Sequence, residues 1–294
     1  MKIVVTGATG LLGNATAKHL LARGHEVVAV DRREGEIAPG VQVNVGDLTN
    51  LEFCDSFMEG AEAVIHLAAI PNPIDERQHE VFSNNVVSSF AIFSAAAHAE
   101  VRIVVYASSL SAYGFPYSES WTSPKYVPVD EDHPLEYEES YALSKEVNEL
   151  SARMWHSRTG TSFVGMRFPW TNLPDKTYEL AARSKNEDTL PPNPRFPKGI
   201  VAKILWCYLD LRDAAAALET VVMSDFKGSD TFNFAAPDTM SDEPTIELMK
   251  KFHPTSEIRG DISGNLAPYS SERFIKRFGY KPQYLLDRDE LKKL

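Results

Sequence analysis

Tyr141 and Lys145 lie four residues apart in the segment SYALSK, which begins at residue 140. On a helix this spacing places both side chains on one face. A tyrosine hydroxyl can carry a substrate proton if its pKa falls from about 10 toward neutrality, and a neighbouring ammonium favours that change. A fall of about three pKa units corresponds to about 4 kcal/mol. Of the 11 tyrosines only Tyr141 precedes a lysine by this spacing, yet such a pair alone is also typical of an ordinary amphipathic helix.

Two serines end a β-rich run and could complete this chemistry. The run YASSLSAYG (residues 106–114) brings Ser108 and Ser109 to the carboxyl end of an expected strand, where open α/β sheets bind ligands. Either hydroxyl could orient and polarise a substrate oxygen beside Tyr141 and Lys145. Together these residues indicate interconversion of an alcohol and a carbonyl, with a hydride moving to or from a nicotinamide.

A glycine-rich turn follows the first expected strand. In TGATGLLG, the residues Gly7, Gly10 and Gly13 let the backbone approach a pyrophosphate and direct the N–H groups of a helix N-terminus toward it. The spacing is G-x-x-G-x-x-G rather than the stricter G-x-G-x-x-G, so tight packing alone is the other interpretation. The position between a strand and a helix favours dinucleotide binding.

An acidic residue at the end of the second expected strand bears on the choice of cofactor. Asp31 could accept hydrogen bonds from the adenosine ribose hydroxyls, and its charge would repel a 2′-phosphate, which favours NAD. Arg32 and Arg33 follow at once and could pair with such a phosphate, so NADP stays open. Asp47 and Leu48 end the third strand and could flank the adenine, although Asp47 could instead cap the next helix.

The elements that must position these residues follow a regular alternation. Short apolar runs separated by helical patterns predict a doubly wound parallel sheet of the Rossmann type, an α/β fold covered on both faces. The expected strands are residues 2–7, 26–32, 41–47, 62–69, 102–109 and 162–168, and the expected helices are 13–24, 84–99 and 139–157.

The regular alternation breaks after the sixth strand. Residues 186–199 are rich in Pro and polar side chains, and the chain then returns with a strand–helix pattern at 207–223 and a strand at 231–236. Helix patterns recur around 244–252 and 270–278. We therefore expect an NAD-binding domain, 1–168 completed by about 205–236, and a small C-terminal substrate lobe, 169–204 and 237–294.

Composition excludes several classes of function. The chain has 294 residues and a net charge of −11, so a nucleic-acid partner or an anionic membrane surface is disfavoured. Its 2 cysteines and 8 histidines show no metal-type spacing, which predicts no bound metal. No apolar stretch is long enough for a membrane span and no signal-peptide pattern opens the chain. We expect a cytoplasmic protein that acts on a small molecule.

Several motifs together carry a family resemblance. TGATGLLG, GDLTN, HLAA, NNV, SSLSAYG, YALSK and YLDLRDAA occur in order from residue 1 to about 236. As a set they resemble the extended short-chain dehydrogenase/reductase family, the NAD-dependent epimerase/dehydratase type. The tail SSERFIKRFGYKP resembles the last helix of that family more loosely.

The resemblance implies a role for each matched position. It implies that Ser109 and Tyr141 are the catalytic pair, and that Asn85, Tyr141 and Lys145 lie near the nicotinamide ribose. It also implies a homodimer through helices 85–98 and 139–157. The residues that would line the dinucleotide are Gly7, Gly10, Leu11, Gly13, Asp31, Asp47, Leu48 and Ala68.

Some of these positions have structural alternatives. Asn85 could simply start a helix, and Ala68 could be a small residue at a strand end. His66 is more typical of a packed strand residue than of a proton carrier.

Departures from the motifs of the family restrict the range of expected substrates. Leu110 and Ser111 stand where dehydratases carry an acidic pair, so elimination lacks its proton carriers. Pro169 and Ile204 stand near positions where nucleotide-sugar epimerases hold a diphosphate, and a buried diphosphate without cations is costly. Arg167 matches the arginine of the family segment, and Lys203 or Arg212 could compensate for the missing phosphate ligands.

The sequence thus predicts an NAD-dependent oxidoreductase acting on a hydroxyl or carbonyl of a small polar substrate, such as a free sugar or sugar acid. A nucleotide-sugar 4-epimerase is the alternative. A non-catalytic dinucleotide sensor is the second alternative, although such relatives commonly lack the Tyr/Lys pair. Five aromatic residues of loop 115–139 could contact the sugar or could only anchor the loop; they are Phe115, Tyr117, Trp121, Tyr126 and Tyr137.

Overall fold

A seven-stranded parallel sheet forms the centre of the computed structural model, which describes residues 1–185 and 199–294. The strand order is β10-β7-β5-β4-β1-β2-β3, the doubly wound arrangement that the sequence predicts. The Pro-rich stretch 186–198 lies outside the described residues. The strands are β1 (Lys2–Thr6), β2 (Glu26–Asp31), β3 (Val43–Val45), β4 (Ala63–His66), β5 (Ile103–Ser109), β7 (Ser162–Phe168) and β10 (Ser229–Asn233).

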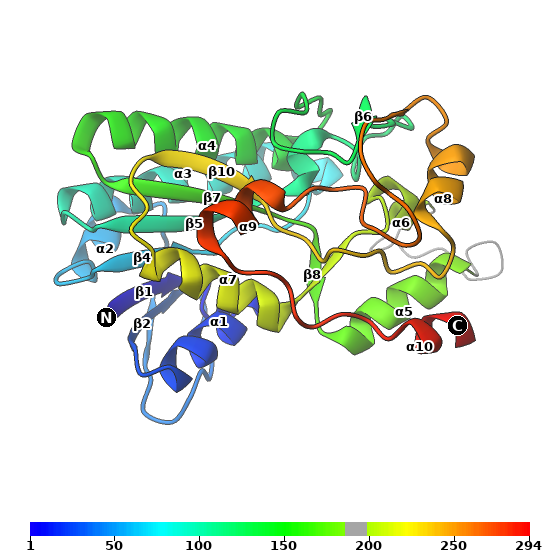
Figure 1. Cartoon of the computed structure of the whole chain (residues 1–294). Coiled ribbons are helices and arrows are strands. Elements are labelled where there is room, and N and C mark those ends of the chain that lie inside the picture. The colour runs from blue at the N-terminus through cyan, green and yellow to red at the C-terminus, as the bar shows by residue number, and fades with distance from the viewer. Residues whose placement is uncertain (186–198) are drawn as a thin grey trace.

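Helices cover both faces of this sheet (Figure 1). On one face α1 packs against α7, and on the other α3 packs against α2 and α4. Their bounds are α1 (Leu11–Ala22), α2 (Leu51–Ser56), α3 (Gln78–His98), α4 (Ser140–Thr159) and α7 (Leu211–Met223).

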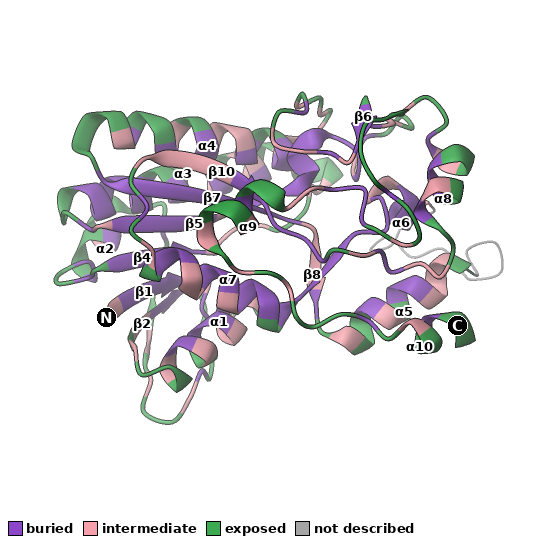
Figure 2. Cartoon of the chain, in the orientation of Figure 1, coloured by how far each residue is buried: buried purple, intermediate pink, exposed green. Residues whose placement is uncertain are grey.

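Strand β1 shows why both faces are apolar. Ile3 and Val5 pack into the hydrophobic cluster under α1 and α7, whereas Val4 packs into the cluster under α2, α3 and α4. All three side chains are fully buried, as the purple sheet interior in Figure 2 shows. A strand buried on both faces has no polar alternation, which is why the apolar runs of the sequence predict it.

The C-terminal elements other than α9 (Glu272–Phe278) enclose a separate hydrophobic cluster, together with residues of the segment after β5 such as Leu110, Tyr113 and Val127. Two short parallel strand pairs, β8 with β9 and β6 with β11, join its segments. The bounds are β6 (Tyr126–Val127), β8 (Trp170–Asn172), α5 (Pro174–Lys185), α6 (Ile200–Lys203), β9 (Tyr208–Asp210), α8 (Thr245–Phe252), β11 (Glu257–Ile258), α9 (Glu272–Phe278) and α10 (Arg288–Lys293).

Helix α9 returns to the large sheet rather than to the C-terminal cluster. Phe274 of α9 is fully buried and packs against Phe232 of β10 and Phe234. The chain end then runs back along α7 and α5 (Figure 1).

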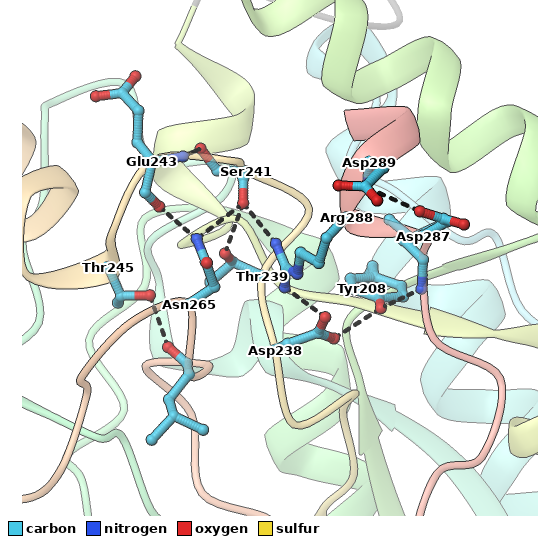
Figure 3. Close-up of polar contacts among 12 residues, drawn as sticks. Tyr208, Asp238, Thr239, Ser241, Glu243, Thr245, Asn265, Asp287, Arg288 and Asp289 are labelled. Carbon is cyan, nitrogen blue, oxygen red and sulfur yellow. Dashed lines mark hydrogen bonds and ion pairs between the residues drawn. The ribbon is translucent and has the colours of Figure 1, made fainter. Parts of the chain in front are cut away.

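Polar contacts attach the C-terminal segment to β9 and its neighbours (Figure 3). Arg288 forms an ion pair with Asp238 and donates to the carbonyl of Ser241 at 2.6 Å. The hydroxyl of Tyr208 donates to Asp238 at 2.7 Å and accepts from the backbone N–H of Leu286 at 2.9 Å. These bonds fix the tail beside the strand that leads into α7.

Candidate active site

The glycine-rich loop is pressed against the segment that follows β4. Gly7 has a φ of +67°, and a Cβ there would lie 2.8 Å from the backbone nitrogen of Ala68. A Cβ on Gly13 would lie 1.9 Å from the carbonyl oxygen of Gly7. Gly10 caps α1 without a side-chain hydrogen bond, and Leu11, the first helical residue, is exposed. The turn therefore offers bare backbone N–H groups at a helix N-terminus, which suits a pyrophosphate.

His66 joins this loop to the helix behind it. Its Nδ1 lies 2.7 Å from Thr6 Oγ1, and its Nε2 lies 3.0 Å from Ser89 Oγ. Burial, and then the nearby charge of Lys145, lower the pKa of His66 to about 3. The imidazole thus stays neutral and acts as a packed strand residue.

Asp31 lies beside the glycine-rich loop at the end of β2. Its carboxylate accepts from the backbone N–H of Thr9 at 3.0 Å and from that of Arg33 at 3.2 Å. The side chains of Arg32 and Arg33 are exposed. A carboxylate held this way stands where the ribose of a dinucleotide on the loop would come.

Asp47 and Leu48 differ in exposure. Leu48 packs into the core, and Asp47 is exposed and accepts from the N–H of Thr49 at 2.9 Å. The capping interpretation of Asp47 is wrong, because Asn50 caps α2 and accepts from the N–H of Phe53.

Asn85 holds the segment after β4 in place. Its Oδ1 accepts from the N–H of Ile70 at 2.8 Å, and its Nδ2 donates to the Ile70 carbonyl at 3.0 Å. The helix-start interpretation of Asn85 is wrong, since α3 begins at Gln78 and Asn85 lies inside it. Its amide instead fixes the backbone next to Ala68, at the edge of the glycine-rich loop.

The two serines of β5 have different partners. Ser108 donates to Glu149 Oε1 at 2.6 Å, so its hydroxyl is committed to the interior. Ser109 Oγ accepts from the N–H of Ser111 at 3.0 Å and forms a side-chain hydrogen bond with Tyr141. Ser109 is therefore the serine that shares the site with Tyr141.

Lys145 is held in place by the carboxyl end of β5. Its Nζ donates to the carbonyl of Ala107 at 2.8 Å and lies 5.3 Å from the ring centre of Tyr141. Burial lowers the pKa of Lys145 to about 8, and the charge of Glu149 opposes that fall.

The pKa of Tyr141 in this cofactor-free chain lies well above its ordinary value. Burial is the first cause, the neighbouring phenol of Tyr117 and the charge of Glu139 add to it, and the hydrogen bond from Ser109 opposes it. The lowered pKa that the sequence predicts for Tyr141 is therefore not found in this structure.

Two further side chains enclose Tyr141: Tyr117, one of the five loop aromatics named from the sequence, and Glu139, which sequence reasoning missed. Tyr117 packs edge-to-face on its ring at a centroid distance of 6.1 Å. Glu139 caps α4 and accepts from the N–H groups of Tyr141 and Ala142. The only sequence signal for Glu139 was its place two residues before Tyr141.

The other aromatic residues of loop 115–139 attach the loop to the rest of the protein. Phe115 and Tyr126 are buried, and Trp121 stacks on His253 at 5.6 Å between ring centroids. The Tyr137 hydroxyl donates to Glu146. Of the five, Tyr117 is the one that reaches the site.

Lys203 and Arg212, the two cations that could compensate for the missing phosphate ligands, are engaged elsewhere, and so is Arg167. Arg167 forms a buried two-bond pair with Glu149, at 2.9 and 2.7 Å. Lys203 donates to the carbonyl of Ser118, and Arg212 forms two bonds with Asp210. None of the three is held toward the catalytic edge by these contacts.

Neither a metal-binding cluster nor a membrane-spanning helix is present among the described residues. No group of three or more His, Cys, Asp or Glu side chains there could hold a metal ion. No helix in residues 1–185 or 199–294 is long and apolar enough to cross a membrane.

Comparison with known proteins found a matching family model and similar sequences. The model of the NAD dependent epimerase/dehydratase family matches residues 3–177. The chain is 35% identical over 153 residues to sterol demethylase protein B of Methylococcus capsulatus, covering 49% of this chain and 45% of that protein. It is 27% identical over 183 residues to L-arabinose 1-dehydrogenase (NAD(P)(+)) of Haloferax volcanii, covering 60% and 70%.

Among solved structures, a short-chain dehydrogenase/reductase superfamily protein from Agrobacterium tumefaciens with bound NAD is similar over the whole chain. The TM-score is 0.72 at 24% identity, covering 100% of this chain and 95% of that one. At this identity the likeness shows the fold. The chain spans about half the length of the first curated relatives that it matches, at 45% and 55%.

Proposed function

The chain belongs to the NAD dependent epimerase/dehydratase family, and we propose that it is an NAD-dependent oxidoreductase of the extended short-chain dehydrogenase type. The proposed reaction moves a hydride between nicotinamide and a hydroxyl or carbonyl of a small polar substrate, such as a free sugar or sugar acid. One observation carries the proposal. Ser109, Tyr141 and Lys145 meet at the carboxyl edge of the sheet. The glycine-rich loop follows β1 at the same edge, because β1, β4 and β5 are parallel.

The residues present fit a dinucleotide. The turn at Gly7 and Gly13 has no room for a Cβ, and the N-terminus of α1 carries no side-chain cap. Asp31 lies beside that turn and favours NAD over NADP. When bound, the nicotinamide would accept or supply the hydride.

Each catalytic side chain has a role that its contacts support. In the oxidative direction Tyr141 takes the proton of the substrate hydroxyl at its own oxygen. Ser109, hydrogen-bonded to Tyr141, holds the substrate oxygen. Lys145, anchored on the Ala107 carbonyl, binds the ribose and adds positive charge near the phenol. Tyr117 covers the ring of Tyr141 and limits access of water.

A small substrate is favoured over a nucleotide sugar by the engagement of Arg167 with Glu149. The pair is buried, so breaking it to bind a diphosphate would cost several kcal/mol, about 3–5. The sugar dehydrogenase among the relatives supports the same choice.

The test is a substrate screen. Purified enzyme is mixed with aldoses and uronates, each with NAD and with NADP, and nicotinamide absorbance is followed. We expect turnover of a free sugar or sugar acid, faster with NAD. In parallel, UDP alone is added to the enzyme in a thermal unfolding assay. Stabilisation by UDP together with no turnover of any free sugar would contradict this proposal and favour the nucleotide-sugar 4-epimerase.

We also propose a homodimer through α3 and α4. The outer face of these two helices exposes large apolar side chains, each between 37% and 49% accessible. A contiguous apolar face on paired helices is typical of an interface. The residues are Val87, Phe90, Leu143, Leu150 and Met154.

A further inference from the structure

The first turn of α4 carries a negative charge next to the proposed catalytic phenol. Glu139 is the N-cap of this helix. Its Oε1 accepts from the N–H of Ala142 at 2.9 Å, and its Oε2 accepts from the N–H of Tyr141. These N–H groups have no partner within the helix, so the carboxylate is held by the helix end itself.

Capping alone does not call for a glutamate. The preferred N-cap residues are Ser, Thr, Asp and Asn, whose short side chains reach the first-turn N–H groups. Three other helices of this chain follow that rule, with Asn50, Asp210 and Asp287 as caps. At the start of α4 the longer and charged Glu139 takes that place.

The charge of Glu139 acts on both phenols of the site. It raises the pKa of Tyr141 and that of Tyr117, after burial as the first cause in each. The same burial raises the pKa of Glu139, which the two N–H bonds oppose. Around the phenol of Tyr141, α4 also contributes Lys145 and the loop contributes Tyr117, while β5 contributes the neutral hydroxyl of Ser109.

We propose that Glu139 is a positioning residue for the proposed reaction: held on the first-turn N–H groups of Tyr141 and Ala142, its carboxylate fixes the start of α4 and opposes loss of the phenol proton of Tyr141. This inference rests on the proposed function. A neutral phenol is the stable form in a buried, cofactor-free site, because an unpaired phenolate there would be costly. A bound nicotinamide would add positive charge that opposes the effect of Glu139, and Tyr141 would have to release its own proton to solvent before its oxygen could accept one from a substrate hydroxyl.

Glu139→Gln tests the charge, since the amide oxygen can still accept a helix N–H. In the oxidative direction the rate rises with pH as Tyr141 loses its proton. Removing the negative charge should lower the midpoint of that rise in kcat by about half a pH unit or more. Glu139→Asp keeps the charge and should leave the midpoint close to that of the wild type.

Glu138→Gln is the matched control. Glu138 is the neighbouring, exposed carboxylate and bonds Ser120, so its removal changes the net charge equally. In Glu138→Gln the midpoint of the rise in kcat with pH should equal that of the wild type. An unchanged midpoint in Glu139→Gln, with only kcat or thermal stability reduced, would show a merely structural cap and overturn the proposal.

Two further measurements test the proposal if Glu139→Gln does not fold or if the wild type turns over no substrate. If Glu139→Gln does not fold, Glu139→Ser removes the charge and keeps a preferred cap, and the same shift is expected. If no substrate is turned over by the wild type, tyrosinate absorbance is titrated in the NAD-saturated enzyme, with Tyr141→Phe subtracted. Ionisation of Tyr141 at a lower pH in Glu139→Gln would support the inference, although the proposed function had failed; identical titrations would refute it.

Discussion

The ammonium of Lys145 lies 5.3 Å from the ring centre of Tyr141, and its Nζ donates to the carbonyl of Ala107 at 2.8 Å rather than to the phenol. The position of Lys145 is therefore set by β5, with its ammonium beside the ring of Tyr141. Ser109, at the end of the same strand, bonds the phenol. One strand end thus positions both the hydroxyl and the ammonium that surround the proposed proton carrier.

Removing the hydroxyl of Tyr141 should abolish nearly all turnover and leave the affinity for NAD almost unchanged. Tyr141→Phe removes only the hydroxyl, so general acid–base catalysis is lost and kcat should fall by about 10² to 10⁴. The dissociation constant for NAD, measured by calorimetry, should change by less than about threefold, since the ring and Lys145 remain. Tyr280→Phe is the control, because its hydroxyl bonds Asp213 away from the site. Wild-type kcat in Tyr141→Phe would refute the assigned role.

The buried lysine predicts a pH dependence of stability. Burial lowers the pKa of Lys145 to about 8 in the folded chain, whereas an unfolded lysine titrates near 10.4. Between these values the unfolded chain binds more protons, so the free energy of unfolding rises with pH; below pH 8 this contribution is constant. Relative to Lys145→Met, the wild type should gain about 2 kcal/mol between pH 8 and about 9.5.

Urea unfolding of both proteins across this pH range measures the difference. The Cys and Tyr groups of the unfolded chain titrate in the same range, but they are common to both proteins and cancel. Parallel stability curves would show that Lys145 keeps its ordinary pKa.

Sequence patterns located the sheet closely because its strands are buried on both faces. An uninterrupted apolar run such as IVVYA in β5 has few alternative interpretations. The pairs β8–β9 and β6–β11 were not predicted, since strands of two or three residues carry no periodicity. Helix α3 was predicted to begin at about residue 84 instead of 78, because its first turns are mostly polar.

The candidate site was predictable only where residue type and local position decide the chemistry. Tyr141, Lys145 and the glycines are recognisable by spacing. The choice between Ser108 and Ser109 depends on Glu149, and it required the structure. The role of Asn85 depends on contacts across 15 residues of chain, which no local pattern shows.

The buried pair Arg167–Glu149 should behave as a unit. Both side chains are almost inaccessible and two bonds join them, so losing one partner leaves an unpaired buried charge. Glu149→Met or Arg167→Met alone should lower the free energy of unfolding by about 3–5 kcal/mol. The double variant Glu149→Met with Arg167→Met should be more stable than the sum of the two losses implies.

Urea unfolding of the two single variants and the double variant completes this cycle. The ion pair Arg273–Asp230 is the control, since both side chains are partly exposed and their loss should cost less than about 1 kcal/mol. Additive losses at Glu149 and Arg167 would contradict the coupling.

Asp31 should set the preference for NAD. Asp31→Asn keeps an acceptor for the N–H of Thr9 but removes the charge that repels a 2′-phosphate. Arg32 and Arg33, both exposed, are then able to pair with that phosphate. The ratio of kcat/KM for NADP to that for NAD should rise at least about tenfold, an effect of about 1.4 kcal/mol. Glu34→Gln, on the same exposed loop, should leave the ratio unchanged; a wild type that prefers NADP would refute the assignment.

The proposed dimer depends on the apolar face of α3 and α4. Met154→Glu places a charge on that face, where desolvation on association would be costly, so the dimer should dissociate. Met223 is exposed to a similar degree at the end of α7, and Met223→Glu should leave the mass unchanged. Light scattering after size exclusion gives the mass of each variant. A monomeric wild type, or a dimer that survives Met154→Glu together with Leu150→Glu, would show that this face is not the interface.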